Sequence, residues 1–242
     1  MKKAISFFAV LMFSIAGLLQ GAGFFNLGEY DKAPCFFFSG AYYYGSRDIV
    51  LGAQTDQVYS LEYLDYEGII GFAVSDSFAI YGAAAFSDFN LTDNINGDMD
   101  IKLSGGIRLK LFEIVKIALK AGESESRTFD LSFVSDFKIS YFSGSGVAVV
   151  DSAIINVDWM EYQGAFVAIV DIDPFTFYLG TKLSFINGNF DPAFAEELEF
   201  SNDGFFSILI GSSYDLSKGV RLQAEASIFA ETSLGANLQF YF

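Results

Sequence analysis

Charged residues recur at alternate positions in segments that the sequence predicts to be β-strands. If these strands close into a barrel, the bases would form a basic wall that faces acids across the lumen, and a pore would then carry a transverse field. A second interpretation is that the charges pair inside a filled barrel, and the sequence leaves both open. The lumen set comprises Lys102, Arg108, Lys110, Lys116, Lys120, Lys138, Asp65, Glu67, Glu161 and Glu225.

A catalytic role for these residues has little support. The chain contains no histidine, which excludes Ser-His-Asp and Cys-His catalysis and histidine-ligated zinc. Asp65 and Glu67 would share a strand face and could do acid–base chemistry, but so could many lumen carboxylates that do none. Segment 92–97 begins with Thr where a calcium loop needs Asp. We therefore expect no enzyme, no metal site and no cofactor, and the strand-alternate bases do not indicate nucleic acid.

The composition favours strands and leaves much apolar surface to be placed. Of 242 residues, 52% are apolar and 18% are aromatic, with Phe and Tyr prominent, which is typical of sheet proteins and not of disordered chains. The length suits one domain. After residue 23, polar residues interrupt every apolar run within about ten positions, too short for a spanning helix. The apolar surface then lies in a soluble sandwich core or on the lipid face of a barrel.

The start of the chain is predicted to be a secretory signal peptide over residues 1–23. Two lysines precede an uncharged, mostly apolar run over 4–19, and small residues follow at 21–23. A membrane anchor helix is the alternative, but this run is short for the roughly 20 residues that a span needs. The barrel would then occupy residues 24–242. Cys35 is the single cysteine, so it cannot form an internal disulfide, and we expect a small strand residue there.

The last segment of the chain decides between sandwich and barrel. Its alternate positions are apolar, and the positions between them are Gly235, Asn237, Gln239 and Tyr241. This segment resembles the C-terminal signature of bacterial outer-membrane β-barrels. The resemblance implies a location in the outer membrane and recognition by the barrel-assembly machinery. The residues that would carry this assembly signal are Leu234, Ala236, Leu238, Phe240 and Phe242.

Similar two-residue periodicity predicts an all-β, antiparallel, up-and-down transmembrane barrel of about twelve strands, with ten as the alternative. Tight turns are expected at 74–77, 112–114, 143–146, 171–174 and 215–219, and longer loops at 46–57, 91–98, 123–129 and 187–197. Both termini would lie at the periplasmic end. The strands are predicted near 36–45, 58–74, 78–91, 99–111, 115–122, 130–142, 147–157, 160–170, 175–186, 198–213, 220–230 and 233–242.

Several internal stretches resemble small bacterial outer-membrane β-barrel or porin-like families. They are 81–89, 159–163, 174–182, 204–216 and 225–231. The resemblance implies a barrel in a Gram-negative-type outer membrane. It implies no particular substrate and transfers no catalytic residues.

These patterns predict an outer-membrane β-barrel that is a small passive pore for small hydrophilic solutes. The alternative is a plugged, non-conducting structural or surface-binding barrel. Acids in the longer loops would raise the local cation concentration or simply keep the loops soluble. Aromatic residues near strand ends would form interfacial girdles, with a stacking track in the lumen as the alternative: Tyr42, Tyr43, Tyr44, Tyr59, Tyr63, Tyr66, Trp159 and Tyr162.

Overall fold

The computed structural model describes residues 33–52, 58–91, 95–120, 126–148, 153–192 and 197–242, without the side chains of 114–129 and 192. The predicted signal peptide lies outside these residues. The described part is all-β and contains twelve strands. They are β1 (Cys35–Leu51), β2 (Val58–Ser75), β3 (Phe78–Leu91), β4 (Ile95–Gly97), β5 (Asp100–Lys120), β6 (Ser126–Ala148), β7 (Ile154–Ile172), β8 (Phe175–Pro192), β9 (Leu198–Asn202), β10 (Phe206–Ser217), β11 (Val220–Phe229) and β12 (Glu231–Tyr241).

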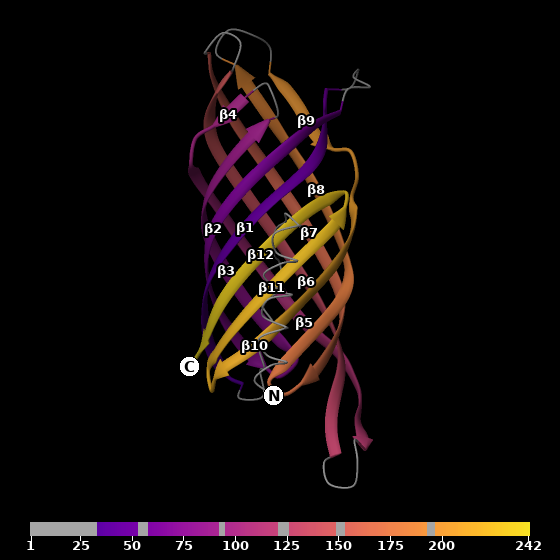
Figure 1. Ribbon diagram of the computed structural model, residues 1–242. Coiled ribbons are helices and arrows are strands. Elements are labelled where there is room, and N and C mark those ends of the chain that lie inside the picture. Colours follow the sequence, from indigo (N-terminus) through magenta and orange to yellow (C-terminus); the bar gives the residue numbers. More distant parts are fainter. Residues whose placement is uncertain (1–32, 53–57, 92–94, 121–125, 149–152, 193–196) are drawn as a thin grey trace, which may run out of the picture.

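The strands close into one antiparallel barrel, as predicted (Figure 1). Strands that are neighbours in the chain pair with one another except β4 with β5 and β9 with β10, and β12 pairs with β1 from Phe37↔Tyr241 to Arg47↔Glu231. Closure gives every long strand a partner on both sides. It therefore removes unpaired strand edges, whose backbone N–H and C=O groups would find no hydrogen-bond partner in lipid.

The ring of strands narrows along the barrel axis. β4 and β5 follow one another between β3 and β6, and β9 and β10 follow one another along β8. The twelve strands less β4 and β9 therefore form a ring of ten at one level. The β11–β12 hairpin stops part-way up the wall, so Ile49–Leu51 of β1 pair instead with Phe200–Asn202 of β9 (Figure 1). At that level the ring contains eight strands: β1, β2, β3, β4, β6, β7, β8 and β9.

An asparagine side chain hydrogen-bonds to backbone groups of the wall where β9 ends and β10 begins. The backbone N–H of Ile186 donates to Oδ1 of Asn202 at 3.0 Å, and Nδ2 of Asn202 donates to the carbonyl of Ser184 at 2.8 Å and to the carbonyl of Gly204. The amide therefore replaces ladder hydrogen bonds that the interrupted strand cannot make, which a buried backbone requires.

The two ends of the barrel differ. We call the end that holds the tight connections 75–78, 172–175 and 217–220 the turn end, and the opposite end the loop end. Cys35 and Tyr241, the outermost residues of β1 and β12, both lie at the turn end. The β5–β6 hairpin also points this way and extends beyond the rest of the wall (Figure 1).

Several predicted strand boundaries are wrong. Residues 112–114 and 143–146 are not turns, because they lie inside β5 and β6, and β5 has register shifts near the first of them. The predicted strands 99–111 and 115–122 are therefore one strand. β7 likewise contains all of predicted strand 160–170 and the last four residues of predicted strand 147–157, and predicted strand 198–213 is divided into β9 and β10.

The predicted long loops are also shorter than expected. β1, β6 and β8 extend well into 46–57, 123–129 and 187–197, and segment 91–98 contains β4. Segment 123–129 was expected opposite the tight turns, but its described residues 126–129 pair with residues 117–120 at the turn end.

Candidate functional site

The inward face of the wall carries charged residues that the two-residue periodicity of the strands places there. Side chains alternate strictly, as in β1, where Phe36 is 61% exposed and Phe37 is 1% exposed. Among the described residues, the buried charges balance at six bases and six acids, so the acidic excess of the chain lies elsewhere. We call this set the lumen charges: Arg47, Lys102, Arg108, Lys138, Lys182, Arg221, Asp65, Glu67, Asp136, Glu161, Glu225 and Glu231.

Most lumen charges form short ion pairs between strands. Nζ of Lys102 lies 2.9 Å from Oδ2 of Asp65, and Nζ of Lys138 lies 2.7 Å from Oε1 of Glu67. Nη2 of Arg108 lies 2.7 Å from Oδ2 of Asp136. Because an unpaired buried charge is strongly destabilising, these pairs are what allow the charges to be buried at all.

Four lumen charges meet in one hub, which consists of Arg47, Glu161, Lys182 and Glu231. Nη2 of Arg47 lies 2.6 Å from Oε1 of Glu161 and 2.8 Å from Oε2 of Glu231. Nζ of Lys182 contacts Oε1 of Glu231 at 2.6 Å, and Nζ of Lys102 lies 3.7 Å from Oε2 of Glu161. The hub joins β1, β7, β8 and β12 across the lumen at the level where the β11–β12 hairpin ends.

Three lumen tyrosines each cover a glycine of the neighbouring strand and donate to a carboxylate. Tyr63 covers Gly45, Tyr81 covers Gly106 and Tyr178 covers Gly211, and a Cβ on any of these glycines would overlap the ring. Their hydroxyls donate to Glu231 at 2.8 Å, to Asp136 at 2.7 Å and to Glu225 at 2.6 Å, respectively. The glycines therefore make room for rings that both fill the lumen and fix the carboxylates.

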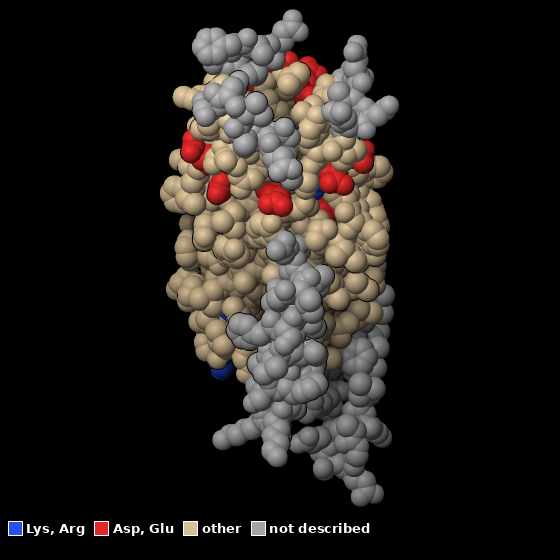
Figure 2. Space-filling view, turned by 45° about the horizontal axis from the view of Figure 1, so that its top comes forward, with Lys and Arg blue, Asp and Glu red and all other residues tan. Residues whose placement is uncertain are grey.

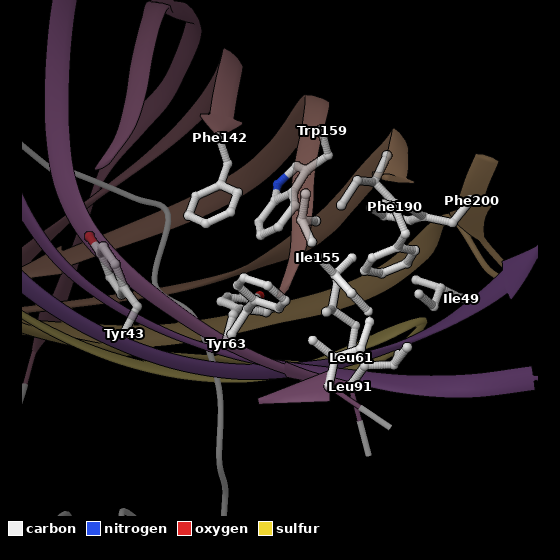
Figure 3. Close-up of a cluster of buried hydrophobic side chains, with 14 of the residues drawn as sticks. Tyr43, Ile49, Leu61, Tyr63, Leu91, Phe142, Ile155, Trp159, Phe190 and Phe200 are labelled. Atoms are coloured by element: carbon white, nitrogen blue, oxygen red, sulfur yellow. The ribbon is translucent and has the colours of Figure 1, made fainter. Parts of the chain in front are cut away.

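Towards the loop end the lumen is filled by apolar side chains (Figure 3). The rings of Phe142 and Trp159 stack at 4.0 Å, and Phe89 meets Trp159 edge-on at 5.8 Å. Tyr43, Tyr63 and Trp159 were predicted in interfacial girdles, but they point inward. We call this set the outer apolar cluster; its buried members are Ala41, Tyr43, Ile49, Leu61, Tyr63, Phe89, Leu91, Ile95, Phe142, Ile155, Val157, Trp159, Ile186, Phe190 and Phe200.

The outward face at the loop end is polar, the reverse of the wall below it. We call this part of the wall, beyond the tip of the β11–β12 hairpin, the outer section. Figure 2 shows acids around the upper part of the barrel and an almost uncharged wall beneath. The outward or rim residues of the outer section include Asp48, Glu62, Asp88, Asn90, Asn96, Asp98, Asn156, Asp158, Asn187, Asp191, Glu199 and Asp203. An apolar interior and a polar exterior are what a strand wall needs in water.

Below the outer section, the outward face is an apolar belt. On β2 the belt runs from Val74 to Leu64, and these ten residue steps rise roughly 33 Å along the strand. With a strand tilt of about 40°, its height is about 25 Å, the value typical of membrane barrels. Exposed members include Phe36, Phe38, Ile70, Val74, Ile80, Phe86, Ile101, Leu103, Ile107, Phe137, Ile139, Phe166, Leu179, Leu183, Phe185, Ile210, Leu222 and Leu238.

Most of the residues singled out in the sequence lie in this lumen. Lys102, Arg108, Lys138, Asp65, Glu67, Glu161 and Glu225 are buried there. Lys110 is not among the buried lumen charges. It lies beside a register shift of β5 and pairs with exposed Glu113. The side chains of Lys116 and Lys120 lie outside the described residues. Leu234, Ala236, Leu238, Phe240 and Phe242 lie on the outward side of β12 or just beyond it.

The predicted lumen set did not include five of the lumen charges, although each stands at an inward position of its strand: Arg47, Asp136, Lys182, Arg221 and Glu231. The inward register of β1, β6, β8, β11 and β12 was the available signal. Within the described ranges, no cluster of three or more His, Cys, Asp or Glu side chains is placed to bind a metal ion. The same residues contain no helix that is long and apolar enough to cross a membrane.

A closed antiparallel sheet with an apolar belt outside and charges inside is the form in which strands cross an outer membrane. The chain is therefore an outer-membrane β-barrel in contact with lipid.

No family model and no curated protein matches the chain. Among solved structures it is similar to an outer membrane channel from Pseudomonas putida F1, with 12% identity and a TM-score of 0.42, over 90% of this chain and all of that one. The transport unit of autotransporter AIDA-I from Escherichia coli is 6% identical with a TM-score of 0.43, over 89% of this chain and 92% of that one. The translocator domain of autotransporter NalP from Neisseria meningitidis is 8% identical with a TM-score of 0.38, over 99% of this chain and 95% of that one.

Proposed function

We propose that this outer-membrane barrel is closed to solutes in the state described here and acts at the outer surface of the membrane. The observation that carries the proposal is the filling of the lumen in two successive layers. Paired lumen charges, each less than a tenth exposed, occupy the level of the membrane together with Ala41, Tyr43 and Tyr63 of the outer apolar cluster. The rest of that cluster occupies the level above. A water-filled channel would leave such charges hydrated.

The number of strands supports the same function. A barrel of about eight strands is just wide enough for its own side chains to fill, whereas aqueous channels occur in barrels of about sixteen to eighteen strands. This ring has ten strands at the level of the belt and eight in the outer section. The interior is therefore of a size that side chains occupy.

The orientation follows from the two ends. We place the turn end in the periplasm and the outer section outside the cell, as in other bacterial barrels. The outer section would then present a rigid, acidic surface for contacts with other molecules. Assembly would use the lipid-facing residues Leu234, Ala236, Leu238, Phe240 and Phe242 as the signal for the barrel-assembly machinery.

A passive pore for small hydrophilic solutes is the second candidate, and the lumen charges favour it. Apolar side chains could fill a barrel at least as stably as buried ion pairs do, so a polar lumen suggests contact with water or solute. The buried amides of Asn237 and Gln239 also have no hydrogen-bond partner among the described residues. In such a pore Lys102, Arg108, Lys138, Asp65, Glu67, Glu161 and Glu225, with Lys110, Lys116 and Lys120 towards the turn end, would set selectivity. We propose no catalytic role.

Osmotic swelling of liposomes distinguishes the two candidates. Residues 24–242, which we call the mature chain because they lack the predicted signal peptide, are refolded into liposomes. Insertion is checked by heat-modifiable migration on a gel. We expect no swelling in arabinose or glycine beyond that of empty liposomes. Swelling that depends on the inserted protein and falls with solute size would contradict the closed barrel and establish the pore.

A further inference from the structure

A groove of about 500 Å³ lies on the outward face of β11, β12, β1 and β2. Its floor is the cross-strand pair Gly40↔Gly68. A Cβ on Gly40 would meet no atom within 4 Å, and one on Gly68 would meet only the carbonyl of Ala84 at 3.9 Å. The two missing side chains therefore create the depression, and no packing requirement of the fold explains the glycines.

Larger residues rise around this floor. Leu222 and Leu238 line the side towards β11, and Tyr42 and Tyr66 stand at the end nearer the outer section. The two tyrosine rings meet edge-on at 5.3 Å, and both are almost half exposed. The groove is consequently an open, largely apolar depression that two amphipathic rings bound at one end.

The place of the groove in the wall indicates what fills it. Tyr42 precedes the first polar outward position of β1, Ser46, by four residues, about 13 Å along the strand. The groove thus belongs to the apolar belt, in the half nearer the loop end, and is continuous with the surface that lipid covers. Tyrosine rings at this depth are typical of the membrane interface, where the hydroxyl reaches the polar head groups.

We propose that this groove binds one acyl chain of a membrane lipid, with Tyr42 and Tyr66 beside the head-group end of that chain. A flexible hydrocarbon chain fits a narrow depression floored by two glycines. A second barrel would meet it only with a convex wall, and a stable protein interface needs roughly 1,000 Å² or more. The inference rests on the lipid-facing belt and is independent of whether the lumen conducts.

Photo-crosslinking tests the proposal directly. The refolded mature chain is placed in bilayers that contain a phosphatidylcholine with a diazirine on its acyl chain, and the labelled peptides are mapped. We expect the peptides around Gly40 and Gly68 to be labelled several-fold above the rest of the belt. The double variant Gly40→Leu/Gly68→Leu fills the groove and should reduce this labelling to the belt average.

Gly105→Leu is the matched control, because Gly105 also faces outward and a Cβ there would meet only the carbonyl of Tyr81 at 3.8 Å, outside the groove. It should keep the wild-type labelling, and all variants should keep heat-modifiable migration. The proposal would be overturned if the wild type were labelled no more at the groove than elsewhere on the belt. It would also be overturned if the filled variant kept the wild-type labelling at the groove. Crosslinks between two copies of the chain at this site would likewise overturn it.

Discussion

The ring of Tyr63 covers Gly45 on the neighbouring strand, and the hydroxyl of the same tyrosine donates to Glu231 at 2.8 Å. The pair links packing to electrostatics, since the glycine determines where the ring lies and the ring fixes a carboxylate of the hub. Arg47 completes the arrangement, with its guanidinium carbon 5.3 Å from the centre of the Tyr63 ring.

Gly45→Ala is expected to destabilise the barrel. The new methyl group would overlap the Tyr63 ring and push it away from Glu231, and overpacking of this kind costs about 1–3 kcal/mol. The temperature at which the heat-modifiable gel shift is lost should fall. Gly40→Ala, which adds a methyl group to open space on the outward face, should leave that temperature unchanged or raise it slightly. Equal effects of the two changes would contradict the role of Gly45.

The Lys138–Glu67 pair should show strong energetic coupling. Removing Lys138 alone, as Lys138→Met, leaves the buried carboxylate of Glu67 without this ion pair and is expected to cost about 3–5 kcal/mol. The double variant Lys138→Met/Glu67→Met should be more stable than the sum of the single effects predicts. A urea-unfolding double-mutant cycle measures the difference, and additive effects would mean that the two charges are solvated separately.

An arginine scan locates the lipid boundary. Ile70 lies in the apolar belt and is 64% exposed, so Ile70→Arg should cost about 2–4 kcal/mol in a bilayer. Asn156 faces outward in the outer section, and Asn156→Arg should be close to neutral. Unfolding in lipid vesicles by urea compares the two. A large cost at Asn156 would place the membrane higher on the wall than we infer.

Cysteine labelling on intact cells tests the orientation. Cys35 is buried and should give little background. A cysteine in place of Asn156 should react with a membrane-impermeant maleimide, and one in place of Leu179 in the belt should not. Labelling at Asn156 only after the outer membrane is permeabilised would show that the loop end faces the periplasm.

The sequence predicted the barrel class because apolar and polar residues alternate with a two-residue period along membrane strands. Phe36 and Phe37 are the same residue type with opposite environments, and the strand predicted near 36–45, which begins with them, is part of β1. The alternation in β12 also predicts that Asn237 and Gln239 face inward, and both are buried. Local patterning decides which face is apolar, and that is the information a single strand contains.

The remaining errors have physical causes. Ser143 to Gly146 contain the residues of a turn, but β7 pairs with all four on one side. On the other side β5 pairs with Ser143 and β4 pairs with Gly146, which keeps the segment in β6. The sequence analysis missed that the outer section has its apolar face inside and its polar face outside. Alternation looks the same whether the apolar face points to lipid or to a core, and Leu61 is an apolar residue that points to the core. The hub joins residues more than a hundred positions apart, such as Arg47 and Glu161, so only closure of the barrel brings them together.

The most direct test of the closed lumen is single-channel recording of the refolded mature chain in a planar bilayer. With insertion confirmed by heat-modifiable migration, we predict no stepwise conductance between moderate positive and negative voltages, because paired lumen charges and the outer apolar cluster fill the path. Reproducible steps of uniform size in the wild-type protein, with a reversal potential that changes in Lys102→Met, would contradict the closed barrel and show that ions pass the lumen charges.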